Sequence, residues 1–105
     1  MAYKLIVFVP NSHLDRVRDA ICAAGAGKIG NYDFCTFATE GIGTFRPLRG
    51  DKPYKGKIGR IEKVKEVRLE VLVPKKLLKK VVRAMKAAHP YEEPAYDVYR
   101  LPPAP

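Results

Sequence analysis

The residues best suited to chemistry lie near the end of the chain, in a short segment bracketed by two prolines. Because proline restricts the backbone, polar groups there are held in place at a low entropic cost. His89, Glu92 and Glu93 offer nitrogen and oxygen atoms of the kind that bind divalent metal ions, although their spacing matches no established zinc pattern. Cys35 or His13 could join them. The alternative is structural: His89 caps a helix end, and the two glutamates pair with nearby basic groups.

A second group of candidate residues lies in the segment 41–64, which we expect to be a long basic loop between two strands. Seven basic residues outnumber two acids there, and five glycines and two prolines interrupt the segment. Glycine turns and arginine side chains can together bind a phosphate or a carboxylate, although this glycine spacing matches no nucleotide-binding fingerprint. A β-hairpin extension that grips a neighbouring subunit is an equally good interpretation.

A third feature is a run of cations without any acid, made up of Lys75, Lys76, Lys79, Lys80, Arg83 and Lys86. At about 100° per residue, these positions fall within a stripe of about 140° on one side of a helix. Such a stripe is typical of a solvated helix face, and it could also follow a phosphate backbone. The whole chain has a formal net charge of +9, which favours anionic partners such as nucleic acid, nucleotides or acidic proteins.

An internal repeat indicates which elements position these residues. When the chain is shifted by 64 residues, eleven positions match in one ungapped register. The matches begin with Leu5, which pairs with Leu69, and end with Asp33, which pairs with Asp97. We therefore expect two copies of one strand–helix–strand unit.

Local patterns within each copy agree with the repeat. Strands are expected at 3–9, 32–39, 65–73 and 95–100, with a helix after the first and the third. In the first helix Ser12 is the expected N-cap, with Asp15 three residues on, and Gly25 and Gly27 end the helix. The sequence predicts one α+β domain over 1–105 with a ferredoxin-like βαββαβ fold, in which a four-stranded antiparallel sheet carries both helices on one face. A proline-rich tail, 102–105, follows.

The repeat also indicates which face of the sheet meets the helices. Alternate residues from Leu5 to Val9 recur in the second copy and are expected in the core. The other face then has Ile6, Phe8 and Leu72 at its centre, whereas an uncovered face is usually polar. Because contiguous exposed apolar surface marks a partner site, we expect this face to pack in an oligomer. Stacking of nucleic-acid bases is the other interpretation, but the third strand lacks the aromatic and glycine residues of ribonucleoprotein-type domains.

Length and composition exclude several classes of protein. A chain of 105 residues is too short for separate cofactor and substrate domains. The first apolar run is short and ends at Pro10, so we expect neither a signal peptide nor a membrane span. Cys22 and Cys35 are expected to be reduced thiols of a cytoplasmic protein. We expect no enzyme, because neither a paired carboxylate nor a Ser–His–Asp or Cys–His arrangement is recognisable.

The motifs themselves resemble a known family. The run HPYEEPAYDVY resembles the closing motif of CutA-like proteins, and with G-x-I-G-N-Y-D and G-x-G-T-F-R-P it resembles the inserted domain of the Nif-three-like (YqfO) family. The resemblance covers the chain from Tyr3 to Leu101. It implies a PII/CutA-like fold that commonly assembles as a trimer with the sheets facing inward. The flanking halves that hold a dinuclear metal site in that family have no counterpart here, which implies a stand-alone module without residues for hydrolase activity.

The resemblance also implies where ligands bind. PII-like relatives sense nucleotides or metabolites through the loop between the second and third strands and through clefts between subunits. Carried over, this implies a ligand site made up of Gly41, Gly43, Thr44, Phe45, Arg46, Tyr91 and Glu93. His89 and Glu92 are the candidate ligands of a divalent metal ion.

Three functions remain open at this point. The first is a non-enzymatic, homo-oligomeric binding module, with a trimer favoured, that binds a small anion, a nucleotide or a metal ion at subunit clefts and regulates a partner. The second is a nucleic-acid-binding protein that uses the basic helix and loop. The third is a metal-dependent, hydrolase-associated protein. No membrane partner is expected.

Overall fold

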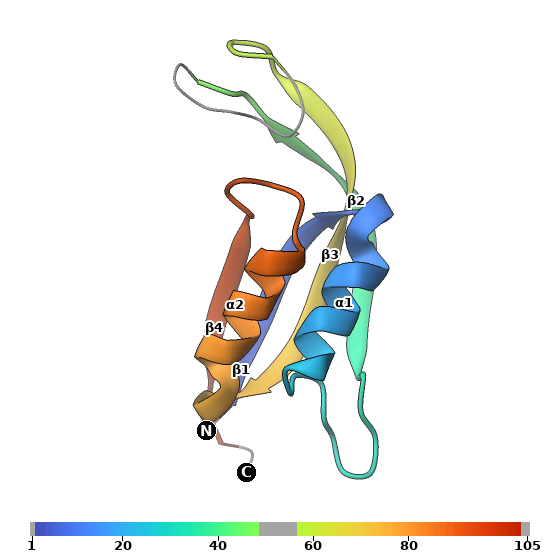
Figure 1. The fold of residues 1–105 in the computed structure, drawn as a ribbon, viewed down its shortest axis with the longest axis vertical. Helices are drawn as coiled ribbons and strands as arrows, with labels where there is room; N and C mark the ends of the chain where they lie inside the picture. The colour runs from blue at the N-terminus through green and yellow to red at the C-terminus, as the bar shows by residue number, and fades with distance from the viewer. Residues whose placement is uncertain (1, 49–56, 104–105) are drawn as a thin grey trace.

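The βαββαβ order predicted from the sequence is confirmed by the computed structural model, which describes residues 2–48 and 57–103. The elements are β1 (Ala2–Pro10), η1 (Asn11–His13), α1 (Leu14–Ala23), β2 (Thr36–Phe45), β3 (Glu62–Pro74), η2 (Lys75–Leu77), α2 (Leu78–Ala88) and β4 (Tyr96–Leu101). All four strands form one sheet in the order β2-β3-β1-β4, with antiparallel neighbours throughout. The two helices lie side by side on one face of it (Figure 1). The fold is therefore ferredoxin-like.

The core lies between this sheet and the helices. In β1 and β3 every second residue points toward the helices, because successive strand residues point to opposite faces. The alternation that predicted the core, Leu5 with Val9 on β1 and Leu69 with Val73 on β3, is confirmed, since all four side chains are buried. Helical spacing brings Val17 of α1 and other apolar residues into the same cluster.

The repeat holds in three dimensions at the start of each half. Pro10 and Pro74 each end a strand, and each is followed by a single 3-10 turn and a helix. One detail of the prediction is wrong: Ser12 lies within the first of these turns, and its hydroxyl contacts His13 Nδ1 at 2.9 Å. Helix α1 therefore begins at Leu14 without a side-chain cap.

The repeat breaks down before the second strand. The predicted strand 32–39 is shifted, because β2 begins only at Thr36. Tyr32 instead forms an isolated bridge with Ile29 and so closes a small turn. Phe34 has a positive φ of 53°, which no strand residue adopts. Asp33 and Asp97 match in the sequence repeat but not in the structure, because Asp97 lies within β4 whereas Asp33 precedes β2.

The two ends of the predicted loop 41–64 belong to a β-hairpin. Strands β2 and β3 pair from Thr36 opposite Val71 to Phe45 opposite Glu62, so both ends of that segment are strand. Beyond the paired strands, the Gly59 N–H donates a hydrogen bond to the Pro47 carbonyl at 2.8 Å. The hairpin projects past the helices (Figure 1) and makes the molecule elongated, 47 × 24 × 22 Å. Residues 49–56 of the expected loop, and residues 104–105 of the expected tail, lie outside the described residues.

The centre of the open face is more buried in the single chain than the sequence led us to expect. Ile6 is only 1% exposed in the single chain, and Phe8 and Leu72 are half-buried. Glu70, directly opposite Ile6, accepts contacts from Lys4 Nζ at 3.9 Å and Arg68 Nε at 3.5 Å. The Arg68 guanidinium also lies 5.8 Å from the centre of the Phe8 ring. On the outer strands of the same face, Phe37 is 66% exposed opposite Glu70, and Tyr99 is 50% exposed opposite Lys4. The expectation that this face packs in an oligomer therefore stays a prediction.

Two further expectations concern the cysteines and the membrane. Cys22 is buried and Cys35 half-buried, and both are free thiols. Burial raises the pKa of the Cys22 thiol, which keeps that thiol protonated. Within the described residues no helix is both long and apolar enough to cross a membrane.

Candidate functional site

His89 is the central residue of the predicted C-terminal motif, and it completes the edge of the sheet. It follows the last turn of α2, where its N–H donates to the Met85 carbonyl at 3.0 Å. The Tyr91 N–H donates to His89 Nδ1 at 3.1 Å, so Nδ1 carries no hydrogen. The hydrogen is therefore on Nε2, which lies 2.8 Å from the Phe8 carbonyl oxygen and donates to it. The β1–β4 pairing ends at Val7 opposite Tyr96, and the His89 side chain donates to the next carbonyl of β1, that of Phe8.

This geometry also determines the charge of His89. The ring is 7% exposed, and burial lowers its pKa below the usual 6.5, opposed in part by the hydrogen bond to Phe8. His13 lowers the pKa of His89 further. His89 is thus neutral at pH 7, and the favoured role at the helix end is that of a hydrogen-bonding anchor rather than a cation.

The predicted metal ligands differ in their surroundings. Both ring nitrogens of His89 are engaged, whereas Glu92 and Glu93 are exposed. Cys35 lies elsewhere, in a hollow of about 250 Å³ on the open face that Lys4 also lines. Over 2–48 and 57–103, no group of three or more His, Cys, Asp or Glu side chains could hold a metal ion. Metal binding by His89 and Glu92 stays a prediction, and it requires His89 to give up a hydrogen bond.

The structure brings the two halves of the predicted ligand site together through aromatic rings. Tyr91 lies 5.1 Å from the centre of the His89 ring and 5.9 Å from the centre of the Phe45 ring. Phe45 ends β2, so the hairpin is joined here to the loop between α2 and β4. We call these three residues the aromatic junction. Contacts at this distance and tilt are favourable, and they fix the base of the hairpin relative to the core.

Beside the junction, Gly43 leaves room for the side chain of Glu66. A Cβ atom at this position would overlap the carboxylate of Glu66, which lies over the Gly43 backbone. Burial raises the pKa of that carboxylate above its usual 4.5. The glycine thus allows an acid to lie against the hairpin, where it holds a proton at a higher pH than an exposed glutamate.

A hollow of about 400 Å³ lies along the same part of the hairpin. Its wall includes Gly41, one of the predicted ligand residues, with Asn11 at the end of β1. The charged residues around it are Glu40, Lys65 and Glu66. The hollow therefore offers two carboxylates, one amide and one ammonium group.

The other predicted ligand residues do not join this arrangement. Thr44, Arg46 and Glu93 are exposed, and Thr44 lies on the strand pair opposite Lys63. Sequence reasoning missed Glu66 and the Phe8 carbonyl. Glu66 is one of three glutamates in β3, spaced four residues apart. The one sequence feature that could have indicated its role is the glycine content of the facing strand.

The fold and the junction define a class of protein: a ferredoxin-like domain with an extended β2–β3 hairpin, similar to solved CutA structures. The Archaeoglobus fulgidus structure described as a periplasmic divalent cation tolerance protein CutA matches with a TM-score of 0.72 over 99% of this chain and 87% of that one. The two sequences are 16% identical, so this likeness concerns the fold alone.

A closer likeness comes from proteins with similar sequences. The chain is 54% identical over 99 residues to a protein of Halalkalibacterium halodurans named GTP cyclohydrolase 1 type 2 homolog. It is 52% identical, with a TM-score of 0.83, to the crystal structure of a Bacillus cereus protein related to NIF3. The chain is therefore homologous to one segment of these two proteins. No protein-family profile matches the chain.

The relationship covers only part of those relatives. The chain spans 27% of the length of the Halalkalibacterium protein and 25% of the Bacillus cereus protein. The resemblance that the motifs indicated is therefore confirmed for this segment.

Proposed function

We propose that the chain is a non-enzymatic, homo-oligomeric binding module, a trimer, that holds a small anion, a nucleotide or a metal ion at clefts between its copies and so regulates a partner. The observation that carries the proposal is the apolar surface of the projecting hairpin. Ile42 is 72% exposed on β2, and Ile61 is 66% exposed just before β3. Leu48 and Ile58, toward the tip, are exposed as well.

Such a hairpin has little to hold it in place by itself. A two-stranded ribbon is at best marginally stable in water, and exposed aliphatic side chains gain free energy when another surface covers them. A second copy of the chain is the simplest cover, because every copy carries the same hairpin. The hollow beside Gly41 is lined in part by Ile42, so a copy that covers Ile42 would also close this hollow into a cleft.

The test is the oligomeric state. Light scattering and native mass spectrometry of the full chain at low micromolar concentration should give a trimer, and the mass spectrum also reports any retained ligand. Ile42→Lys with Ile61→Lys should shift the protein to monomer, because two charges cannot be buried unpaired at an interface. Ile29→Lys, at an exposed isoleucine away from the hairpin, is the matched control and should leave the trimer intact. A wild-type monomer at all concentrations contradicts the proposal.

The non-enzymatic part of the proposal concerns this segment only. The relatives' name refers to GTP cyclohydrolase, and the chain covers about a quarter of them. The polar groups of the junction support a structural role, since His89 is fully engaged in hydrogen bonds with the protein's own backbone. Incubation of the purified chain with GTP should give no product by chromatography, and measurable turnover would overturn this part.

A further inference from the structure

The outer surface of α2, together with the 3-10 turn η2 before it, carries several positive charges and no acid. We call the cations Lys75, Lys76, Lys79, Lys80, Arg83 and Lys86 the α2 basic face, and all six side chains are exposed. The apolar side of the same helix is buried, with Val81 and Met85 at 0% exposure. The helix therefore has one side in the core and one cationic side in water.

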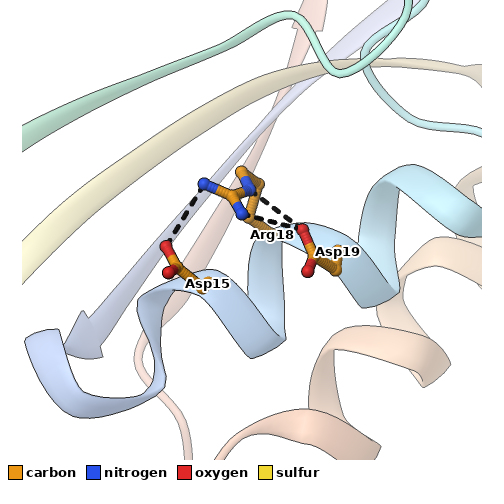
Figure 2. A network of polar contacts seen from close by, with 3 residues as sticks. All are labelled: Asp15, Arg18 and Asp19. Atoms are coloured by element: carbon orange, nitrogen blue, oxygen red, sulfur yellow. Dashed lines mark hydrogen bonds and ion pairs between the residues drawn. The ribbon is translucent and has the colours of Figure 1, made fainter.

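No acid neutralises this face from the neighbouring helix. On α1, Arg18 contacts Asp15 at 3.2 Å and Asp19 at 2.9 Å, so both carboxylates are engaged locally (Figure 2). Among the described residues, the ion pairs join acids to Lys4, Arg18 and Arg68 and involve none of the six cations. Helix α2 itself contains no acid, and Glu92 and Glu93 come only after it ends.

The spacing of the cations suits a repeating anion. Lys79, Arg83 and Lys86 follow one another at intervals of four and three residues, so they lie in one row along the helix. With a rise of about 1.5 Å per residue, the row is roughly 10 Å long. A nucleic-acid duplex presents one phosphate charge about every 1.7 Å of its axis, so several phosphates lie within reach of such a row.

The structure also distinguishes between anionic partners. An amphipathic helix that binds a lipid surface inserts its apolar side, and the apolar side of α2 is already used in the core. No aromatic or amide side chain lies on α2 to stack on bases or read their edges. We propose that the α2 basic face binds the phosphate backbone of duplex nucleic acid without sequence preference.

This surface is independent of the proposed oligomer. Both helices lie on the face of the sheet opposite the open face (Figure 1), and the hairpin that should contact another copy projects beyond them. One of the six cations, Lys86, already has a partner within the chain: its Nζ lies 5.4 Å from the centre of the Tyr96 ring. The test variants therefore leave Lys86 unchanged.

The experiment measures binding of the full chain to two unrelated 20-base-pair DNA duplexes by fluorescence anisotropy, between 50 and 200 mM salt. With six phosphate contacts, the affinity should fall about 1,000-fold over this range, a slope of log K against log salt near −5, and it should be equal for both sequences. The variant Lys79→Gln, Lys80→Gln, Arg83→Gln should have a slope near −3 and bind at least about tenfold more weakly at 50 mM salt.

The matched control removes the same charges elsewhere. Lys57→Gln, Arg60→Gln, Lys63→Gln also exchanges two lysines and one arginine, all exposed and outside α2, and should keep the wild-type slope. Equal loss in both variants would show an effect of net charge alone and overturn the proposal. Absence of duplex binding at 50 mM salt, or binding to phosphatidylserine vesicles in its place, would overturn it too. Light scattering of each variant separates this outcome from any failure of the proposed trimer.

Discussion

At the scale of single residues, His89 supplies hydrogen bonds to backbone groups that no neighbouring strand pairs with. Its two ring nitrogens connect the Phe8 carbonyl of β1 to the Tyr91 N–H of the following loop. Replacing His89 by Ala leaves both backbone groups without these partners, at a cost of about 1–3 kcal/mol for each one that stays buried. The Tyr91 ring would lose its neighbour at the same time, which would loosen the aromatic junction.

We predict that His89 also makes folding stability depend on pH. Its pKa is lowered in the folded protein, so the unfolded chain binds a proton more readily. The stabilisation should be complete above the usual pKa of 6.5 and be lost as the pH falls through the lower value of the folded state. Urea unfolding of the wild type should show this loss between pH 7.5 and pH 5. His89→Ala should be less stable at pH 7.5 and show a smaller change. His13→Ala should also show a somewhat smaller change than the wild type, because His13 lowers the pKa of His89.

One result would contradict the predicted pH dependence at His89. If the wild type and His89→Ala lost the same stability on acidification, the titrating group would lie elsewhere. Such a result would also remove the assignment of the hydrogen to Nε2, because that assignment requires a neutral ring with Nδ1 as the acceptor.

At the scale of elements, the end of α1 depends on backbone that only glycine adopts easily. Gly25 and Gly27 have φ values of +114° and +78°, which confirms their predicted role in ending the helix. At Gly27 a Cβ atom would also lie 3.1 Å from the backbone N and O of Cys35, where the chain returns toward β2. Two constraints therefore act on one residue.

The two constraints can be separated by a matched pair of variants. Gly30 also has a positive φ, +58°, but a Cβ atom there would meet nothing within 4 Å. Gly30→Ala should cost about 1–2 kcal/mol, the usual penalty of the left-handed conformation. Gly27→Ala should cost clearly more, because the backbone of Cys35 must also move. Urea denaturation measures both, and equal costs would mean that the contact with Cys35 has no energetic weight.

Two segments, the one that follows α1 and the one that forms the end of β2, differ from what their sequence patterns predict. The alternation of Tyr32 and Phe34 is typical of a strand, yet the positive φ of Phe34 places it in a turn. A local pattern cannot report this, because the turn is decided by where α1 ends and where β3 offers a partner. In the same way, the glycine-rich segment 41–45 pairs with β3 although its composition indicates a loop.

At the scale of the whole molecule, the repeat makes the two halves equal contributors to one core. Leu5 and Leu69 occupy matching positions, and their exposed fractions are 0% and 1%. We predict that Leu5→Ala and Leu69→Ala each lower the free energy of unfolding by about 2–5 kcal/mol, because each leaves a cavity between the sheet and the helices. Ile29→Ala, at an isoleucine that is 51% exposed and lies away from the hairpin, should change it by less than about 0.5 kcal/mol.

These variants test the architecture directly. Chemical denaturation of each is sufficient, with circular dichroism to confirm the fold. A loss at Leu5 but not at Leu69 would show that the second half contributes little to the core, contrary to the matched burial of the two leucines.

The candidate site was predictable only in part. Phe45, Tyr91 and His89 were nominated from motifs, and they do meet, because the ends of β2 and α2 lie close together in this fold. Glu66 and the Phe8 carbonyl were not predicted. Their importance comes from what lies against them across the sheet, and such contacts have no fixed separation along the chain.

The sequence by itself determined the order of the elements, the two-fold repeat and the face of each strand that enters the core. These follow from periodicity, since alternation in strands and the 3.6-residue period in helices are properties of neighbouring residues. Only the tertiary structure decided that Ile6 is buried on the open face, that residues 41–45 pair with β3 rather than form a loop, and that His89 is neutral. Burial and hydrogen bonding between distant residues determine such features, and both exist only once the chain has folded.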